Sequence, residues 1–187
     1  MSIHRIASRY ARSLIKLAED QNKLVTVYDD VVSLDEIVDS HRDLYLMLKS
    51  PIINPDKKKN IINAIFEGKV DETTLAFLNI LIKKGREMYF PEIFDSFIHQ
   101  YKDLNHISTV FITTASKIDE DTLEKIKSKL LLSSITQEKV EIRTKIDSKL
   151  IGGFVIEIED KLYDASVAHQ LEELKKEFKN NDFKVKL

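Results

Sequence analysis

The five histidines are the residues whose type most readily suggests metal chemistry. A metal held from one helical face needs two ligands three or four positions apart, and no two histidines have that spacing. The chain has no cysteine, which also excludes disulfides and thiolate chemistry. We therefore expect no metal site and no cofactor. The histidines are His4, His41, His99, His106 and His169.

Two short patterns suggest enzymes. Ser13 and Lys16 have the S-x-x-K spacing of some acyl-transfer enzymes, and on a helix they would lie one turn apart. The pattern arises readily by chance, and the S-D-N and K-T-G elements that accompany it in those enzymes are absent. Gly152 and Gly153 form the only glycine pair among four glycines, and no glycine-rich phosphate-binding loop is present.

Acidic side chains also occur in groups, for example Asp29 with Asp30. Paired carboxylates can act as acid and base when their surroundings separate their pKa values. Nothing in the sequence marks an apolar pocket that would do so, and exposed acids are the simpler interpretation. We predict no catalytic residue and expect that the protein is not an enzyme.

Composition narrows the possible partners. Twenty-nine basic residues oppose 31 acidic ones, for a net charge of -2, so no overall positive field would attract nucleic acid. The apolar runs are far shorter than the about 20 residues of a membrane-spanning helix, so we expect membrane association only through a partner. Ile3 begins an amphipathic pattern with no signal peptide before it, which favours a bacterial cytoplasmic protein. The lysines from Lys57 to Lys59 are predicted to be a solvated face.

The elements that would position any site fall into two halves. Up to about Leu104 the apolar residues recur at three and four, which predicts six helices. Asn54 and Pro55 suit the start of the fourth helix, and Asp71 that of the fifth. The six predicted helices cover residues 3–18, 24–38, 44–48, 55–66, 72–82 and 90–104.

Beyond His106 the period changes to two. Strands are predicted at 109–115, 140–146 and 154–158, with a helix capped by Asp119 after the first. A last helix follows Asp164, with Val167, Leu171 and Leu174 among its apolar residues. The predicted fold is α+β and mainly α. A six-helix bundle at 1–105 precedes a small α/β domain at 106–187, in which helices cover a sheet.

The fifth predicted helix has more apolar surface than one core face needs. Phe77, Ile80 and Leu81 lie to one side of its predicted core stripe. One explanation is that the helix is central and buried on several sides. The other is a groove for a partner's amphipathic helix. The core stripe consists of Leu75, Leu78, Ile82 and Gly85.

The first predicted helix has a similar flank. Ile6, Tyr10 and Leu17 lie on one edge of its stripe, with the small Ser13 beside them. Tyrosine at such an edge is a frequent interface residue, because it combines a large apolar body with a polar tip. We expect the two flanks to form two walls of one groove.

Several motifs resemble one known family, the delta (oligomycin-sensitivity-conferring) subunits of F-type ATP synthases. The N-terminal matches are the runs from Arg9 to Leu14, from Leu48 to Pro51 and from Phe77 to Arg86, followed by Phe90 to Ile93. The C-terminal match is more specific. It comprises Val140, Ile142, Ile146-Asp147, Leu150, Gly152-Gly153-Phe154, Ile156-Glu157 and Glu159.

The resemblance implies a non-catalytic stator subunit, one copy per complex, peripheral on the cytoplasmic side of the bacterial inner membrane. It implies that a groove between the first and fifth helices takes the N-terminal helix of an alpha subunit. The partner-binding candidates are Ile6, Tyr10, Ser13, Leu17, Phe77, Ile80 and Leu81. The C-terminal domain is implied to hold the C-terminal ends of the b subunits, and Gly152 and Gly153 to be structural. An unrelated helical adaptor is the alternative.

Overall fold

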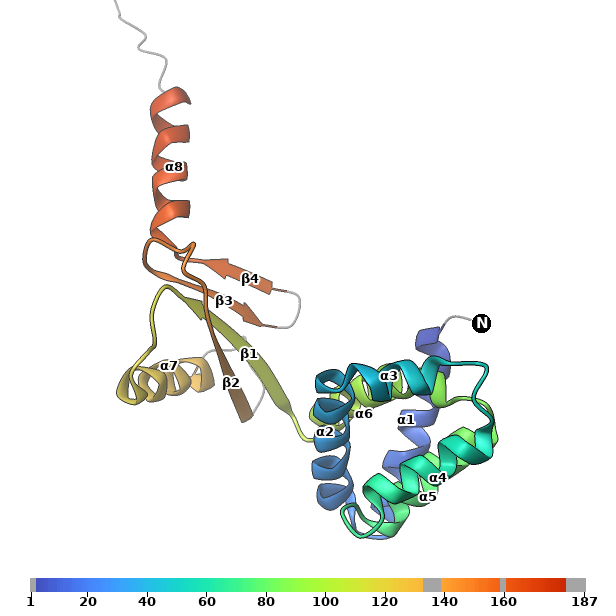
Figure 1. The fold of residues 1–187 in the computed structure, drawn as a ribbon. Coiled ribbons are helices and arrows are strands. Elements are labelled where there is room, and N and C mark those ends of the chain that lie inside the picture. The colour runs from blue at the N-terminus through green and yellow to red at the C-terminus, as the bar shows by residue number, and fades with distance from the viewer. Residues whose placement is uncertain (1–2, 133–138, 159–160, 181–187) are drawn as a thin grey trace, which may run out of the picture. The chain divides into compact units, whose positions relative to one another are not determined.

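The chain is a mainly helical α+β protein whose computed structural model describes residues 3–132, 139–158 and 161–180 (Figure 1). It divides into two compact units, Met1–Leu104 and Asn105–Leu187, one residue before the boundary predicted from the sequence. Glu159 of the C-terminal motif lies outside the described residues. The two units are described separately below.

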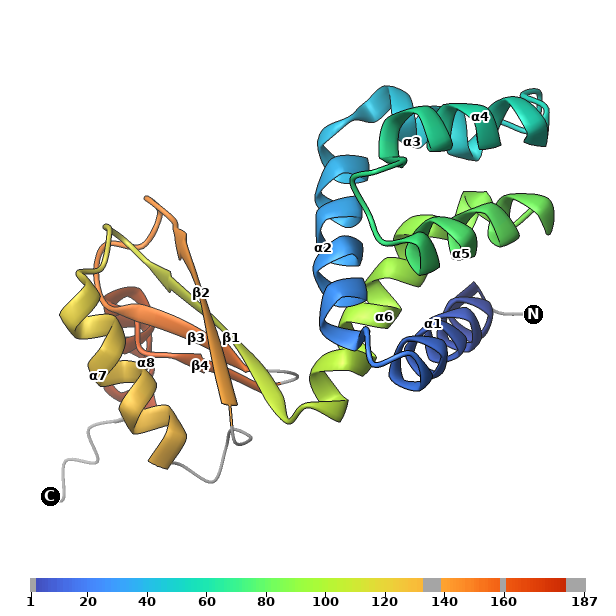
Figure 2. The same ribbon diagram turned by 90° about the horizontal axis from the view of Figure 1, so that it is seen from below.

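The helical unit is organised around its last helix, α6, which packs along α1 and α2 (Figure 2). Phe90, Phe94 and Phe97 of α6 are buried in the core, and Tyr101 stacks on Tyr28 of α2 with the ring centroids 3.9 Å apart. The elements are α1 (Ile3–Asp20), α2 (Leu24–Ser40), α3 (Arg42–Lys49), α4 (Pro55–Phe66), α5 (Glu72–Lys83), the 3-10 helix η1 (Glu87–Tyr89) and α6 (Phe90–Leu104).

The helix starts follow the capping residues that the sequence predicts. The Asn54 side chain accepts a hydrogen bond from the backbone N–H of Asp56 at 2.9 Å, with Pro55 at the first helical position of α4. The Asp71 carboxylate accepts the N–H of Thr73 at 2.8 Å and begins α5. These contacts satisfy backbone donors that have no partner within the helix.

The lysine cluster on α4 departs from its prediction as a solvated face. Lys58 is 2% exposed, and its ammonium lies 2.7 Å from a carboxylate oxygen of Glu87 in η1. The same ammonium donates to the carbonyl of Leu48 at the end of α3, at 2.8 Å. Lys57 and Lys59 on either side are exposed as expected. A buried charge requires an opposite charge and hydrogen-bond acceptors, and the Lys58 ammonium has both. Lys58 of α4 therefore joins η1 and the end of α3 in the interior of the unit.

The C-terminal unit contains a four-stranded sheet in the order β2-β1-β3-β4. Strand β1 pairs in parallel with β2 and antiparallel with β3, which pairs antiparallel with β4. Three strands were predicted, and β4 was missed. The elements are β1 (Ile107–Thr114), α7 (Glu120–Leu132), β2 (Lys139–Ile146), β3 (Phe154–Ile158), β4 (Lys161–Asp164) and α8 (Val167–Asn180).

One face of this sheet forms the core of the unit. Val110 and Ile112 of β1 are fully buried, and Leu123 and Ile126 of α7 pack against them. The carboxylate of Asp119 accepts the N–H of Thr122 at 3.0 Å, the helix start that the sequence predicts for α7. The alternation along β1 puts its even-numbered residues under α7, which fixes the side of the sheet that the helix covers.

Candidate partner-binding surfaces

The first surface runs along one edge of α1. Leu17 is 40% exposed, whereas Ile6 and Tyr10 are half-buried. Ile3 extends the same edge and is 49% exposed. The hydroxyl of Ser13 donates to the carbonyl of Tyr10 at 2.7 Å, so its polar group is satisfied within the helix and contributes little bulk. We call Ile3, Ile6, Tyr10 and Leu17 the apolar edge of α1.

The α5 flank is only partly accessible. Ile80 is 52% exposed, as a docking residue should be. Phe77 is 6% exposed and Leu81 is fully buried, so the prediction that both line an accessible groove is wrong. The alternative explanation, that α5 is buried on several sides, accounts for these two residues. Ile80 is therefore the α5 candidate that can touch a partner without rearrangement of the unit.

Two buried threonines explain why the core face of α5 differs from the predicted stripe. The Thr74 hydroxyl donates to the Asp30 carboxylate at 2.7 Å, and the Thr73 hydroxyl donates to the Gln21 side chain at 2.6 Å. With their hydroxyls satisfied, both residues are buried. The buried face is thereby rotated toward Phe77, and Leu75 of the predicted stripe is only half-buried.

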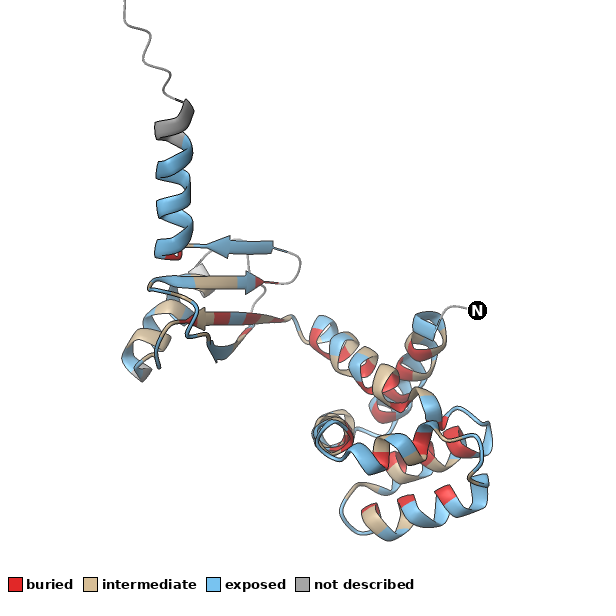
Figure 3. Ribbon diagram, turned by 45° about the horizontal axis from the view of Figure 1, so that its top comes forward, coloured by how far each residue is buried: buried red, intermediate tan, exposed pale blue. Residues whose placement is uncertain are grey.

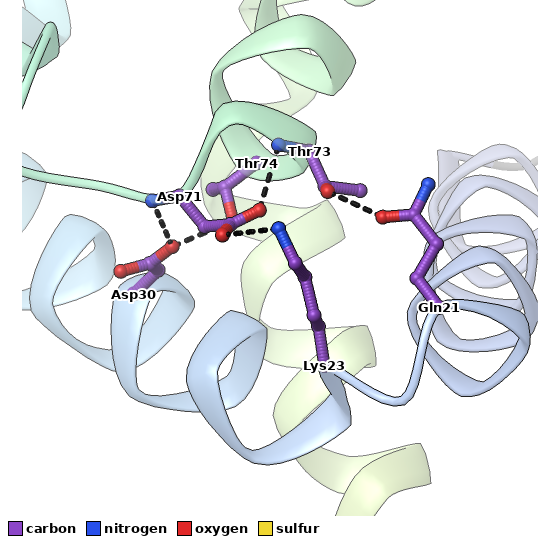
Figure 4. A network of polar contacts seen from close by, with 6 residues as sticks. All are labelled: Gln21, Lys23, Asp30, Asp71, Thr73 and Thr74. Atoms are coloured by element: carbon purple, nitrogen blue, oxygen red, sulfur yellow. Dashed lines mark hydrogen bonds and ion pairs between the residues drawn. The ribbon is translucent and has the colours of Figure 1, made fainter.

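The same contacts link the end of α1 to the start of α5 (Figure 4). The ammonium of Lys23, in the α1–α2 connection, lies 2.8 Å from an Asp71 carboxylate oxygen. The Asp71 N–H donates to Asp30 of α2, also at 2.8 Å. The network therefore fixes the end of α1, the helix with the apolar edge, to the start of α5, the helix that carries Ile80.

The network perturbs one carboxyl group strongly. The hydrogen bond from Lys23, followed by the N–H and hydroxyl of Thr73, lowers the pKa of Asp71 to about 2. The folded pKa lies below the ordinary value of 3.8, so the contribution to stability is complete above pH 4 to 5. It is lost as the pH falls through 2. The network is therefore intact at neutral pH.

The second surface lies on α8 of the C-terminal unit. Val167, Leu171 and Leu174 recur at helical spacing on one stripe, and each is exposed, Leu171 and Leu174 at 48%. The expectation that this last helix covers the sheet is therefore wrong, since α8 projects from it (Figure 1) and is exposed from Val167 to Lys176 (Figure 3). The sequence could not separate the two cases, because a core stripe and a docking stripe share one spacing.

The base of α8 is held at the glycine pair. The Val167 N–H donates to the Gly152 carbonyl at 3.0 Å, and the Ala165 N–H donates to the Phe154 carbonyl at 3.0 Å. Gly153 has φ +79°, and a Cβ there would lie 2.4 Å from the Ala165 carbonyl oxygen. The glycines thus permit the close approach from which α8 begins.

The candidates for chemistry do not assemble into a site. Ser13 bonds Tyr10 instead of Lys16, and Asp30 serves as the acceptor of the α5 network. Burial raises the pKa of Asp95, and the charges of Asp39 and Glu92 add to the effect. Within residues 3–132, 139–158 and 161–180, no three His, Asp or Glu side chains gather to hold a metal ion.

Among the described helices, none is both long and apolar enough to span a membrane.

The fold is similar to that of one chain in a solved ATP synthase structure. A chain of the Toxoplasma gondii mitochondrial ATP synthase hexamer has a similar fold, with a TM-score of 0.72 over 92% of this chain and 96% of that one. The two are 19% identical in sequence.

The sequence comparisons extend over nearly the whole chain. The family model for the ATP synthase delta (OSCP) subunit matches residues 6–178. The ATP synthase subunit delta of Cytophaga hutchinsonii is 38% identical over 93% of this chain and 94% of its own length. That of Christiangramia forsetii is 33% identical over 98% of both. The chain belongs to the ATP synthase delta (OSCP) subunit family, as a non-catalytic subunit of the peripheral stalk.

Proposed function

We propose that this subunit links the catalytic head to the membrane-anchored b subunits, one copy per complex, on the cytoplasmic side of the bacterial inner membrane. In this proposal the helical unit binds the N-terminal helix of the alpha subunit, and the C-terminal unit binds the C-terminal ends of the b subunits. A stator joint has to resist the torque of the rotor, so it has to bind tightly and needs no reacting group.

The observation that carries the proposal is the apolar edge of α1, which remains accessible although the same helix already buries a complete core face. Ala11, Leu14 and Ala18 supply that face. Leu17 and Ile80 are large aliphatic side chains left over on α1 and α5. Apolar surface beyond the needs of a core is typical of a docking site for an amphipathic helix.

The C-terminal unit offers a separate surface of the same kind. The α8 stripe of Val167, Leu171 and Leu174 has helical spacing, and Ile151 in the preceding loop is 77% exposed. Ile151 and Leu171 line a hollow beside this stripe together with Lys175. A typical specific interface buries about 800 Å² per partner, which a helix docked along α8 can approach.

Two docking sites on one chain suit a stalk joint. When one partner of the complex is bound, the other site is held close to the second partner. The effective concentration for this second binding step then rises to the order of millimolar. Each interface can then be modest while the assembly is tight.

The alpha-subunit site is tested by titrating the full chain with a peptide of the alpha N-terminal helix. Ile80→Asp and Leu17→Asp should each weaken binding about tenfold or more, since a charge would be placed in an apolar interface. Leu46→Asp is the matched control, because Leu46 on α3 is 51% exposed and lies outside the proposed site. Circular dichroism checks that all three variants stay folded. Equal affinity of the Ile80 variant and the control would refute the site.

The b-subunit site is tested in the same way with a soluble C-terminal fragment of b. Leu171→Asp should lower its affinity, whereas Leu162→Asp should leave it unchanged. Leu162 on β4 is 65% exposed and pairs with Glu157, on the sheet face opposite to the one that α7 covers. Failure of the full chain to co-purify with both alpha and b would refute the proposed link between the catalytic head and the b subunits.

A further inference from the structure

A row of basic side chains runs along the solvent face of α1. Arg5, Arg9, Arg12 and Lys16 are all exposed, and at 100° per residue they fall within an arc of about 60°. We call these four residues the basic row. The first 18 residues contain no Asp or Glu, and the only acids of α1, Glu19 and Asp20, follow one turn after Lys16, at the far end of the row from Arg5 and Arg9.

The basic row has no partner within the described part of the chain. The ion pairs of the helical unit use other cations, with Lys23 on Asp71 and Lys58 on Glu87. Arg5, Arg9 and Arg12 instead line a shallow surface hollow of about 300 Å³ together with His4 and Ser8. Four cations on one helix, in a chain of net charge -2, therefore face solvent without an ion pair in the described part of the chain.

The position of the row beside the apolar edge indicates what would neutralise it. On the helical wheel Ser13 separates Arg9 and Lys16 from Tyr10 and Leu17. A helix lying on the apolar edge would pass over the small Ser13, within reach of the long Arg9 and Lys16 side chains. Arginine and lysine extend an apolar stem and end in a charge, so both can border an apolar seam.

We propose that the basic row selects a docking helix whose apolar seam is flanked by carboxylates on the side that meets α1. This inference rests on the proposed binding of the alpha-subunit N-terminal helix and adds its chemistry, an acidic amphipathic helix. Complementary charges at the rim of an interface raise the association rate and discriminate against other helices. They also fix the direction in which the helix lies, because only one direction puts its acids over the row.

The test uses the full chain and a synthetic alpha N-terminal peptide, with a second peptide in which Asp and Glu are replaced by Asn and Gln. The double variant Arg9→Glu/Lys16→Glu should bind the acidic peptide about tenfold more weakly in 50 mM salt, mainly through slower association. In 500 mM salt the difference should shrink, because the charges are screened. Lys57→Glu/Lys59→Glu is the control, since it changes the net charge equally at exposed positions on α4.

The possible outcomes test the role of the basic row, the docking site and the kind of partner separately. Binding that is independent of salt, with the two double variants alike, overturns the role of the basic row but leaves the docking site in place. Equal affinity for the acidic and amide peptides does the same. No binding of the peptide to the wild-type chain overturns the docking itself. One further result would assign the row to a lipid surface and overturn the inference. In that case phosphatidylglycerol vesicles would capture the wild-type chain but not the Arg9→Glu/Lys16→Glu variant, and the wild-type chain would bind the acidic and amide peptides equally.

Discussion

Replacement of Gly153 by alanine should unfold the base of α8 while leaving the helical unit intact. The added Cβ would lie 2.4 Å from the Ala165 carbonyl oxygen and 2.9 Å from the Ser166 Cα, both of them backbone atoms that cannot rotate away. The backbone at 165–166 must therefore shift. Such a shift disturbs the bonds from Ala165 to Phe154 and from Val167 to Gly152, with which α8 begins.

The expected loss of stability in Gly153→Ala has two parts, and the same substitution at Gly68 measures the first part alone. A left-handed conformation costs a residue with a side chain about 1 kcal/mol. Overpacking against fixed atoms adds roughly 1–3 kcal/mol. Gly68 has a similar φ of +76° but open space where its Cβ would lie. We therefore expect Gly68→Ala to cost about 1 kcal/mol and Gly153→Ala to cost about 3 kcal/mol.

Urea unfolding followed by circular dichroism measures both costs, and hydrogen exchange localises them. In Gly153→Ala the amides of β3, β4 and α8 should exchange faster, whereas those of α2 and α6 should keep their protection. Gly152→Ala should be mild, because its Cβ would meet only a Val167 methyl group at 3.3 Å. If Gly153→Ala cost no more than Gly68→Ala, the close approach at Ala165 would not be the reason for the glycine.

Two further predictions concern the charges inside the helical unit. Lys58→Met should destabilise the fold by about 3–5 kcal/mol, because Glu87 would keep a buried charge without its partner, and Glu87→Gln added to it should restore part of the loss. Lys57→Met should change the unfolding free energy by less than about 0.5 kcal/mol in the same urea series, and equal costs at the two lysines would contradict the buried pair. Asp71→Asn should lower stability by about 1 kcal/mol at pH 7, a value reduced by solvent screening because Lys23 is 43% exposed. The difference from wild type should shrink between pH 4 and pH 2, and a constant difference down to pH 2 would show that the Asp71 pKa is not lowered.

Local chemistry made much of this fold predictable. Asn54, Asp71 and Asp119 begin their helices as predicted, because a cap depends only on residues two or three positions away. Strand β4 escaped prediction because its four residues are all exposed and have neither a long β-branched run nor a buried alternation.

Features that depend on distant partners were not predictable. Lys58 is identical in type to its neighbours, and its partner Glu87 lies 29 positions away. Burial of Thr74 depends on Asp30, 44 positions away, so the hydrophobic pattern alone misplaced the core face of α5. Of the groove candidates, Leu17, Ser13 and Ile80 are exposed and Phe77 and Leu81 are not, a division that only the packing of the unit determines.

The most direct measurement of the stator role is whether the two partners bind one chain together. The full chain is mixed with the alpha N-terminal peptide and a soluble b fragment, and the mass of the resulting complex is measured by light scattering after size exclusion. We predict a single complex containing all three. The Ile80→Asp variant should lose only the peptide, and Leu171→Asp only the b fragment. Displacement of one partner by the other, or loss of both in either variant, would contradict two separate docking surfaces.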